Sequence, residues 1–371
     1  MRRWGVARLS FVLVTLAAAC GGSSNKQQHD SAGPTADGPS LDTCPILPAN
    51  HIFNTPIDSL PVDPHSSDYL TTIGGTRKLH LDLGTQTDQQ ATDFYGIPWN
   101  TMHGGTDAWS TVAFKSTDPG LDWDPKPESD CGDGSHAVVR PCTTVASPQF
   151  PIPSNALVEG GINNAADEMP YGDHHLLVVD VDACRLWEGY HVYSPASGTW
   201  NIFGAAEFDL KSNALRPADW TSADAAGFPI MPLLLKADEA SSGAIHHALR
   251  FTITSSKIRQ AYVWPARHLT GNGTTSTTQP PMGQLFRLKA DFQIPATFNV
   301  QSKAILQAMK TYGMYIADGG SDWYVSGEPS ANWMDSTFSE VQSVAGSNFE
   351  AVDITAITSR SGFDVNSGAV P

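Results

Sequence analysis

The sequence is poor in positive charge. It holds 22 Lys and Arg against 38 Asp and Glu, which gives a formal net charge of −16 at pH 7. Such a surface repels the phosphate backbone of nucleic acids and other acidic polymers, so we exclude nucleic acid as a partner. Neutral ligands suit this charge balance best.

The motifs of several enzyme classes are also missing. No GxGxxG or GxxxxGK[ST] loop for nucleotides follows a strand and opens a helix, and no GxSxG elbow has the setting of a serine hydrolase. HExxH, HxH, CxxC and EF-hand spacings are absent. We therefore expect no metal centre and no cofactor, although the Asp-rich segment 122–134 could hold a structural calcium ion.

The first twenty residues predict a lipoprotein signal peptide. A basic start precedes a short apolar run, too short to span a membrane, and the segment ends in LAAAC. This ending resembles a bacterial lipobox, so Cys20 is the predicted lipidation site. Gly21 in place of Asp favours sorting to the outer membrane or cell surface. Residues 21–43 are rich in Gly, Ser and Pro, which predicts a flexible tether.

The cysteines beyond Cys20 are even in number, which is typical of an oxidising compartment. We expect one disulfide between Cys131 and Cys142, closing a short loop, and another between Cys44 and Cys184. The second bridge would pin the start of the folded body to a hairpin. Other pairings of the four cysteines remain open.

Residues 44–371 predict a single all-β domain, a β-sandwich or jelly roll with long loops. Turn signals recur between short segments such as LHLDLG, ALRFTIT, GMYIADG and DWYVSG, each of which reads as a strand. Three helices are expected to cover the sheets, over 221–243, 299–313 and 335–347. Pro229 and Pro232 must kink or divide the first of these helices.

The stretch DHHLLVVDVDACRLWEGYHVY, residues 173–193, predicts two strands joined by a tight turn. In the second strand Glu188 stands between Leu186 and Tyr190, on the half that we assign to the interior. A carboxyl beside aromatic rings loses hydration, which raises its pKa toward that of a general acid. The simpler alternative is a salt-bridged strand residue. We select Glu188 as the candidate general acid.

A second carboxylate follows in the strand candidate 199–210, which ends near Asp209. If this strand neighbours the hairpin, Asp209 stands across a groove from Glu188. Glycoside hydrolysis requires two such carboxyls, one to protonate the leaving oxygen and one to attack or to activate water. Asp209 is therefore the candidate base or nucleophile.

Histidines and aromatic residues supply further candidates. His175 and His246 belong to two His-His pairs, and we expect them to position the substrate; the alternative is a structural role. Ten tryptophans favour a sugar ligand, because sugar rings stack on aromatic faces, although large sandwiches also bury tryptophans. The predicted substrate-binding residues are Trp187, Tyr190, Trp264, Glu159 and Arg250.

The segment LRPADWTSADAAGFPIMPLLLKADEASSGAIHHALRFT, followed by AYVWPARH and GMYIADGGSDWYVSG, resembles a family of secreted bacterial β-rich proteins. The resemblance extends from IFNTPIDSLPVDPHS to GSNFEAVD. It implies that residues 44–354 form one integrated domain. It brings no catalytic residue to this sequence, so the candidates above rest on the residues themselves.

These features favour a surface-anchored carbohydrate-active enzyme, a glycoside hydrolase that cleaves a neutral or weakly charged polysaccharide with a carboxylate pair. The nearest variant is a polysaccharide lyase, in which a His or Tyr base removes a proton beside a uronate that Arg250 neutralises. A non-catalytic glycan-binding or adhesion lipoprotein would use the same aromatic residues. We expect a monomer that binds a polysaccharide or oligosaccharide and that contacts a membrane only through its lipid anchor.

Overall fold

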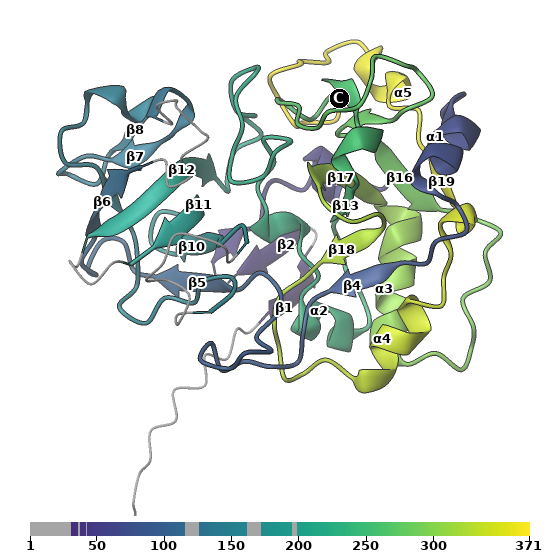
Figure 1. Ribbon diagram of the computed structural model, residues 1–371, viewed down its shortest axis with the longest axis horizontal. Helices are drawn as coiled ribbons and strands as arrows, with labels where there is room; N and C mark the ends of the chain where they lie inside the picture. The colour runs from purple at the N-terminus through teal and green to yellow at the C-terminus, as the bar shows by residue number, and fades with distance from the viewer. Residues whose placement is uncertain (1–30, 36–37, 42, 116–125, 162–171, 195–198) are drawn as a thin grey trace, which may run out of the picture.

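The computed structural model describes residues 31–35, 38–41, 43–115, 126–161, 172–194 and 199–371, and two large sheets dominate it (Figure 1). The eight-stranded sheet has the order β5-β10-β11-β12-β6-β9-β7-β8. Its strands are β5 (Trp99–Met102), β6 (Ser110–Phe114), β7 (Cys131–Gly132), β8 (Val138–Val139), β9 (Gln149–Phe150), β10 (Leu176–Asp180), β11 (Arg185–Tyr193) and β12 (Trp200–Asp209). The six-stranded sheet has the order β19-β16-β17-β13-β18-β4. Its strands are β4 (His80–Asp82), β13 (Leu249–Ile253), β16 (Leu285–Leu288), β17 (Met314–Gly319), β18 (Tyr324–Ser326) and β19 (Phe349–Ala351).

Both large sheets are mixed. Strand β5 lies parallel to β10, β6 to β12, β13 to β17 and β4 to β18, while the other ladders of the two sheets are antiparallel. A further pair, β14 (Arg259–Tyr262) and β15 (Pro281–Met282), is parallel as well. The predicted β class is confirmed as a mostly β fold. The parallel ladders distinguish this fold from a jelly roll, whose sheets are antiparallel.

The predicted hairpin of residues 173–193 is confirmed as β10 and β11, which pair from Leu176 with Gly189 to Asp180 with Arg185. Strand β10 separates two apolar cores. Leu177 and Val179 belong to the larger core, whereas Leu176 and Val178 point into a smaller one. Because both of its faces are covered, β10 is a continuous apolar run in sequence rather than an alternating one.

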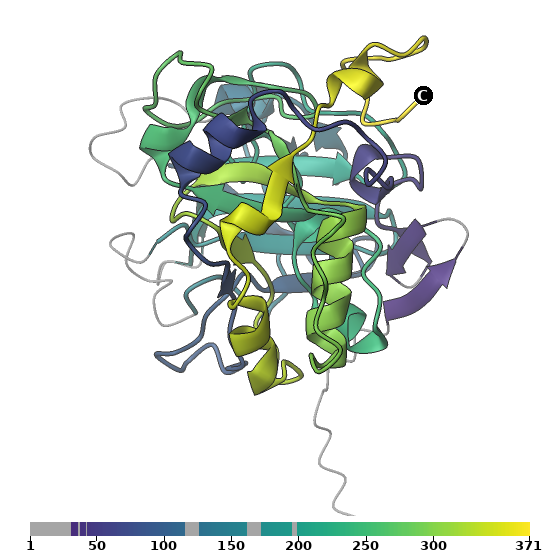
Figure 2. The ribbon, with the colours of Figure 1, turned by 90° about the vertical axis from the view of Figure 1, so that its right-hand side faces the viewer.

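Helices α1, α3 and α4 lie over the outer side of the six-stranded sheet, away from the other sheet (Figures 1 and 2). The helices are α1 (Ser66–Ile73), α2 (Ala237–Ser242), α3 (Val300–Thr311), α4 (Asp335–Val341) and α5 (Thr355–Thr358). Helix α3 packs against β16 and α4, and it buries Ile305 and Met309 as its sequence period predicts. Its N-cap is Asn299, whose side chain accepts a hydrogen bond from the N–H of Ser302 at 2.9 Å.

The predicted helix over 221–243 is mostly wrong. Only a short 3₁₀ turn at Met231–Leu233 and helix α2 at its end are helical, and the rest is irregular. Pro229 and Pro232 explain part of this result, because proline removes a backbone donor and clashes with the preceding turn. Backbone N–H groups of this irregular segment bind side chains instead: Ala225 donates to Asp318, and Ile230 and Met231 donate to Glu188.

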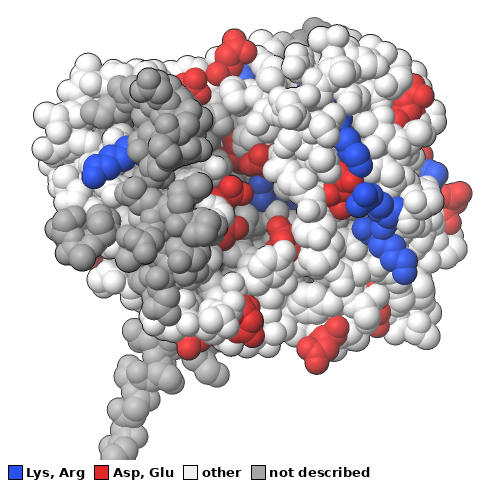
Figure 3. All heavy atoms as spheres, viewed as in Figure 1, with Lys and Arg blue, Asp and Glu red and all other residues white. Residues whose placement is uncertain are grey.

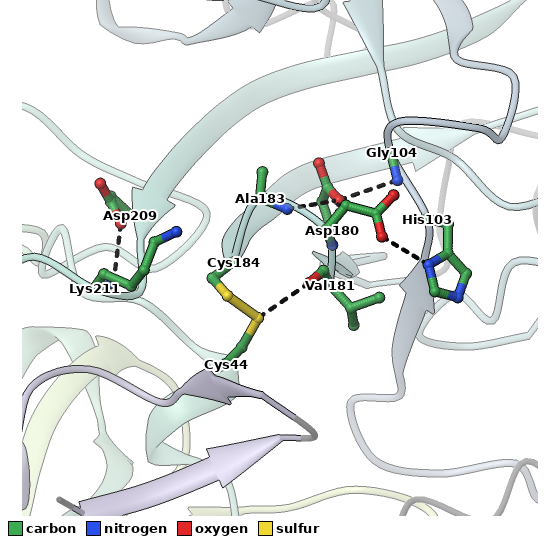
Figure 4. Close-up of a disulfide and its surroundings, with 10 residues drawn as sticks. Cys44, His103, Gly104, Asp180, Val181, Ala183, Cys184, Asp209 and Lys211 are labelled. Atoms are coloured by element: carbon green, nitrogen blue, oxygen red, sulfur yellow. Dashed lines mark hydrogen bonds and ion pairs between the residues drawn. A yellow bond between two sulfur atoms is a disulfide. The ribbon is translucent and has the colours of Figure 1, made fainter.

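The predicted tether of residues 21–43 lies partly outside the described residues, and its described part contains strands. Residues Ser31–Thr35 and Gly38–Leu41 form β1 and β2, which continue into β3 (Cys44–Pro45) as a small antiparallel sheet. Both predicted disulfides are confirmed, Cys44–Cys184 and Cys131–Cys142. Figure 4 shows the first bridge joining β3 to the turn between β10 and β11.

Two disulfides indicate an oxidising, extracytoplasmic compartment, as the cysteine count predicts. Across the described parts of the chain, no helix has the length and apolar character needed to cross a membrane. The predicted signal peptide and its Cys20 lie outside the described residues.

Candidate functional site

Two adjoining hollows share the carboxylates Asp173 and Asp318. The first, here the Arg250 hollow, has a volume of about 220 Å³. Its polar lining includes Asp82, Glu159, His175, Arg250, Thr252, Tyr324 and Ser326. The second, here the Tyr190 hollow, has a volume of about 450 Å³. Its lining includes Tyr190, Phe203, Thr221, Ser222, Ser255 and His268. Figure 3, viewed from the same side as Figure 1, shows acidic side chains gathered in the hollowed middle of the molecule, beside one basic group.

The floor of the Arg250 hollow is the polar face of the six-stranded sheet. In β13, Leu249, Phe251 and Ile253 are buried in the main core, so Arg250 and Thr252 occupy the opposite face. The pairings Thr252 with Tyr324, Thr252 with Asp318, and Ser326 with Asp82 extend this face across β17, β13, β18 and β4. Alternation along β13, β18 and β4, together with a register shift in β17, thus collects polar side chains beneath one hollow.

Arg250 is held by a buried ion pair with Asp224. Its Nη2 lies 3.0 Å from Asp224 Oδ1, and its Nη1 donates to Ser326 Oγ at 2.7 Å. Burial raises the pKa of Asp224, and the positive charge of Arg250 opposes that shift. Nε of Arg250 and Oδ2 of Asp224 have no hydrogen-bond partner among the described residues. Both atoms are buried, and each is left without a partner from the described chain.

His175 and Glu159 form a second buried pair. The imidazole Nδ1 lies 2.6 Å from Glu159 Oε2, and Nε2 lies 3.0 Å from the carbonyl oxygen of Ala223. Both ring nitrogens therefore face acceptors, which favours the doubly protonated ring. Burial alone would lower the pKa of His175, but the Glu159 carboxylate outweighs it and raises the pKa to about 9.

Asp318 is the carboxyl at the junction of the two hollows. It accepts hydrogen bonds from the N–H of Gly319 at 2.6 Å and of Ala225 at 3.3 Å. No Lys, Arg or His of the described chain forms an ion pair with it. Burial, reinforced by the nearby charge of Asp224, raises the pKa of Asp318 to about 7. Asp318 can therefore both give and take a proton near neutral pH.

Asp173, the other carboxylate shared by the two hollows, is exposed and lies at the start of the hairpin. Tyr190 donates to its Oδ1 from the hydroxyl group at 3.4 Å. The negative charge of Asp173 contributes to the raised pKa of Asp318, behind the larger effects of burial and Asp224. The two carboxyls thus interact across the junction of the hollows.

Four of the predicted site residues meet here. His175, Glu159 and Arg250 line the Arg250 hollow, and Tyr190 lines the other hollow. Glu159 reaches His175 from the loop that ends in two glycines, where Gly161 approaches the backbone of Gln89 so closely that a Cβ atom would clash. The glycines thus serve packing of the chain against itself.

Glu188 and Asp209 are not brought together. Glu188 pairs with Ala206, and Asp209 pairs with Arg185. Asp209 is three positions from Ala206 along β12. Side chains an odd number of positions apart point to opposite faces, so Glu188 and Asp209 lie on opposite faces of the sheet. Asp209 accepts a hydrogen bond from the N–H of Lys211 at 2.9 Å in the following turn (Figure 4). The predicted carboxylate pair is therefore not formed.

Glu188 instead binds backbone in the interior. It is 0% exposed and lines neither hollow. Its carboxylate accepts hydrogen bonds from the N–H groups of Ile230 at 2.8 Å and Met231 at 3.0 Å. Burial raises the pKa of Glu188 to about 7, as the sequence predicts, against the effect of these two donors. Its role is to satisfy the irregular segment that replaces the predicted helix.

Three other candidates lie away from the hollows. Trp187 is buried in the smaller core, where Phe150 and Trp109 contact it edge-on. Trp264 is 6% exposed and donates to the carbonyl oxygen of Ser367. His246 lies 3.4 Å from the hydroxyl of Tyr312. None of these three side chains lines either of the two hollows.

The sequence interpretation missed Asp318, Asp173, Asp224, Asp82 and Tyr324. Alternation could have found some of them, because LHLDL, LRFTI and YVS each place polar residues on one face and apolar residues on the other. What alternation does not give is the neighbour of each strand. Asp318 joins the polar face only because β17 shifts register against β13 between Phe251 and Thr252.

In the part of the chain that the structure describes, no group of three or more His, Cys, Asp or Glu side chains is arranged to hold a metal ion. The Asp-rich segment 122–134 lies partly outside the described residues, so its suggested calcium site stays a prediction.

Comparisons of the chain with models of protein families, with curated proteins and with solved structures find no match. The similarity to secreted bacterial proteins stays a prediction. The function must therefore be argued from the geometry of the two hollows and from the chemistry of their residues.

Proposed function

We propose that the protein is a glycoside hydrolase that binds a neutral or weakly charged polysaccharide across both hollows. The observation that carries this proposal is that Asp173 and Asp318 belong to the Arg250 hollow and to the Tyr190 hollow alike. A polymer that occupies both hollows must cross these two carboxyls. Its bond between the two occupied subsites then lies where an acid and a base are available.

Asp318 acts as the general acid in this proposal. With its pKa near 7, it is protonated in about half of the molecules at neutral pH. Its hydrogen-bond partners among the described residues are backbone N–H groups, so the proton is not committed to another side chain. Protonation of the leaving oxygen by such a group lowers the barrier to bond cleavage.

Asp173 acts as the base or the nucleophile. It is exposed to solvent, so a water molecule can reach it. Tyr190 orients it through one hydrogen bond and presents an aromatic face to the larger hollow. Phe203 contacts Tyr190 edge-on at 5.9 Å and extends that wall, which suits the C–H faces of sugar rings.

A polysaccharide lyase is the less favoured variant. It needs a cation free to neutralise a uronate carboxylate, but Arg250 is already paired with Asp224. The same hollow carries Asp82, Asp173 and Asp318, which would repel an acidic sugar. The charges around Arg250 therefore favour hydrolysis of a substrate that is not acidic.

We also propose that the protein acts at the cell surface, attached through a lipid on Cys20. The support is the lipobox-like sequence before Cys20 together with the two disulfides, which suit an extracytoplasmic protein. Metabolic labelling with a fatty-acid analogue would test this attachment, with Cys20→Ser as the variant expected to lose the label.

The enzymatic proposal is tested by the release of reducing ends from a panel of neutral polysaccharides. We expect Asp318→Asn and Asp173→Asn each to reduce kcat by about 10³-fold, because each removes one proton-transfer or nucleophilic group. Asp209→Asn serves as the matched control and keeps the parent rate. Full activity in Asp318→Asn would reject this acid. Binding of a glycan without cleavage by the parent would establish the non-catalytic alternative.

A further inference from the structure

The Arg250 hollow contains more acidic than basic groups. Its two cations are each committed to a carboxylate, Arg250 to Asp224 and His175 to Glu159. Asp82 has no such partner. Among the described residues its side chain is bound by the hydroxyl of Tyr95, and no Lys, Arg or His forms an ion pair with it. A negative charge in this hollow is thus left without a counter-charge.

One tyrosine contacts Asp82, and another lines the same hollow from the neighbouring strand β18. Tyr95 is 44% exposed and donates its hydroxyl hydrogen to Asp82. Tyr324 lines the hollow and stacks on His80 with ring centroids 4.0 Å apart. A hollow lined by a carboxylate and an aromatic ring is a favourable environment for an ammonium group, which is attracted by the carboxylate charge and by the electron-rich ring.

A second, independent observation points to a sugar hydroxyl in the same hollow. Arg250 is 3% exposed, it lines the hollow, and its Nε has no hydrogen-bond partner among the described residues. A buried donor without an acceptor is costly, and a ligand oxygen would satisfy it. An ammonium group and a hydroxyl oxygen on one small ring are the features of an amino sugar.

A metal ion is the other cation that an acidic hollow could bind. The described residues contain no group of three or more metal-binding side chains, so Asp82 lacks the neighbours that a metal site needs. An organic ammonium group requires only one carboxylate and aromatic contacts.

We propose that the Arg250 hollow binds a sugar unit with a protonated amino group, and that Asp82 is the residue that selects it. This inference rests on the proposed function and narrows its substrate class to polysaccharides that contain free amino sugars. The amine faces Asp82 and Tyr324, which both line the hollow, while a hydroxyl oxygen of the same ring accepts from Arg250. The scissile bond joins this sugar unit to the next one and lies beside Asp173 and Asp318.

The test compares two polymers of matched length, one of β-linked glucosamine and one of its N-acetylated form, with the full-length protein. We expect kcat/KM to be at least about tenfold higher for the free amine, since one charge-assisted contact is worth about this factor. In Asp82→Asn the amide oxygen can still accept from Tyr95, so the fold is retained. This variant should reduce the preference for the amine about tenfold, and Asp82→Glu should restore part of it. Asp209→Asn is the control that keeps the preference.

Equal rates on both polymers, or an unchanged preference in Asp82→Asn, would overturn the inference. If the parent cleaves no polysaccharide, the proposed function fails, and the inference is then decided by calorimetric binding of the two oligosaccharides to Asp318→Asn. Tighter binding of the amine that depends on Asp82 supports it, and equal binding rejects it. Loss of amine binding when Ca²⁺ is added, with recovery on chelation, would assign the hollow to a metal instead.

Discussion

Glu188 and Asp318 are both carboxyls whose pKa burial raises to about 7, and they differ in what surrounds them. Two backbone N–H groups cover the oxygens of Glu188, which lines neither of the two hollows. Asp318 opens onto two hollows. A raised pKa therefore marks both carboxyls as buried but does not distinguish their roles. Access to a hollow distinguishes Asp318, which can meet a ligand, from Glu188, which is structural.

Glu188→Gln should affect stability and leave activity intact. The neutral amide places an NH₂ group where Oε2 accepts from Ile230 at 3.0 Å, so the variant is less stable than the parent at pH 5. The parent has a raised carboxyl pKa, so it loses stability as pH rises from about 4.5 through about 7, whereas the amide does not titrate. The difference in thermal midpoint should therefore shrink by pH 9. A constant difference would contradict the raised pKa.

Arg250→Met should destabilise the fold by about 3–5 kcal/mol, because it leaves the buried Asp224 carboxylate without its counter-charge. Urea unfolding at neutral pH measures this loss. The double variant Arg250→Met/Asp224→Asn is the control, and it should cost clearly less than the two single changes together. Additive costs would mean that the two side chains are not coupled.

Secondary structure could be predicted from the sequence where one local rule was sufficient. The hairpin of β10 and β11 and helix α3 follow from apolar runs and a 3.6-residue period, and both disulfides match the preferred one of the three possible pairings. The segment 221–243 is irregular around Pro229 and Pro232, and there Glu188, distant in sequence, accepts the backbone N–H groups of Ile230 and Met231.

The candidate site was less predictable than the strands that carry it. The sequence identified Arg250, Glu159, His175 and Tyr190 by residue type. That Asp173 and Asp318 share the same two hollows, however, depends on how the two sheets face each other. That arrangement is fixed by long-range pairing and by a register shift in β17, and neither leaves a local signal in the sequence.

Asn299→Ala should loosen the helices that cover the six-stranded sheet. Asn299 caps α3 through Ser302, and its Nδ2 also donates to Ser336 Oγ at 2.8 Å and Thr337 Oγ1 at 3.0 Å in α4. We expect a loss of about 2 kcal/mol in urea unfolding, one part from the cap and one from the link between helices. Asn299→Asp keeps the acceptor and should lose less. An equal loss in both variants would show that the cap contributes nothing.

The whole molecule should lose stability as pH rises from 6.5 to 9. Burial raises the pKa of Glu188, Asp318 and Glu328 to about 7, and the Glu159 carboxylate, outweighing burial, raises that of His175 to about 9. In this range the folded protein binds more protons than the unfolded chain, so the free energy of unfolding falls. Calorimetry at several pH values measures the decline. His175→Gln should flatten its upper part, and a rising midpoint would contradict the assignment.

The bridge between Cys44 and Cys184 has a mechanical consequence. A pulling force applied at the N-terminal side of β3 passes through sulfur into the turn between β10 and β11, instead of peeling β3 away from its neighbours. The load then reaches β11 and β12 along their length, where many ladder hydrogen bonds share it in shear. In a single-molecule stretching experiment, reduction of the bridge should let β3 and the segment that follows it detach at a lower force than in the oxidised protein.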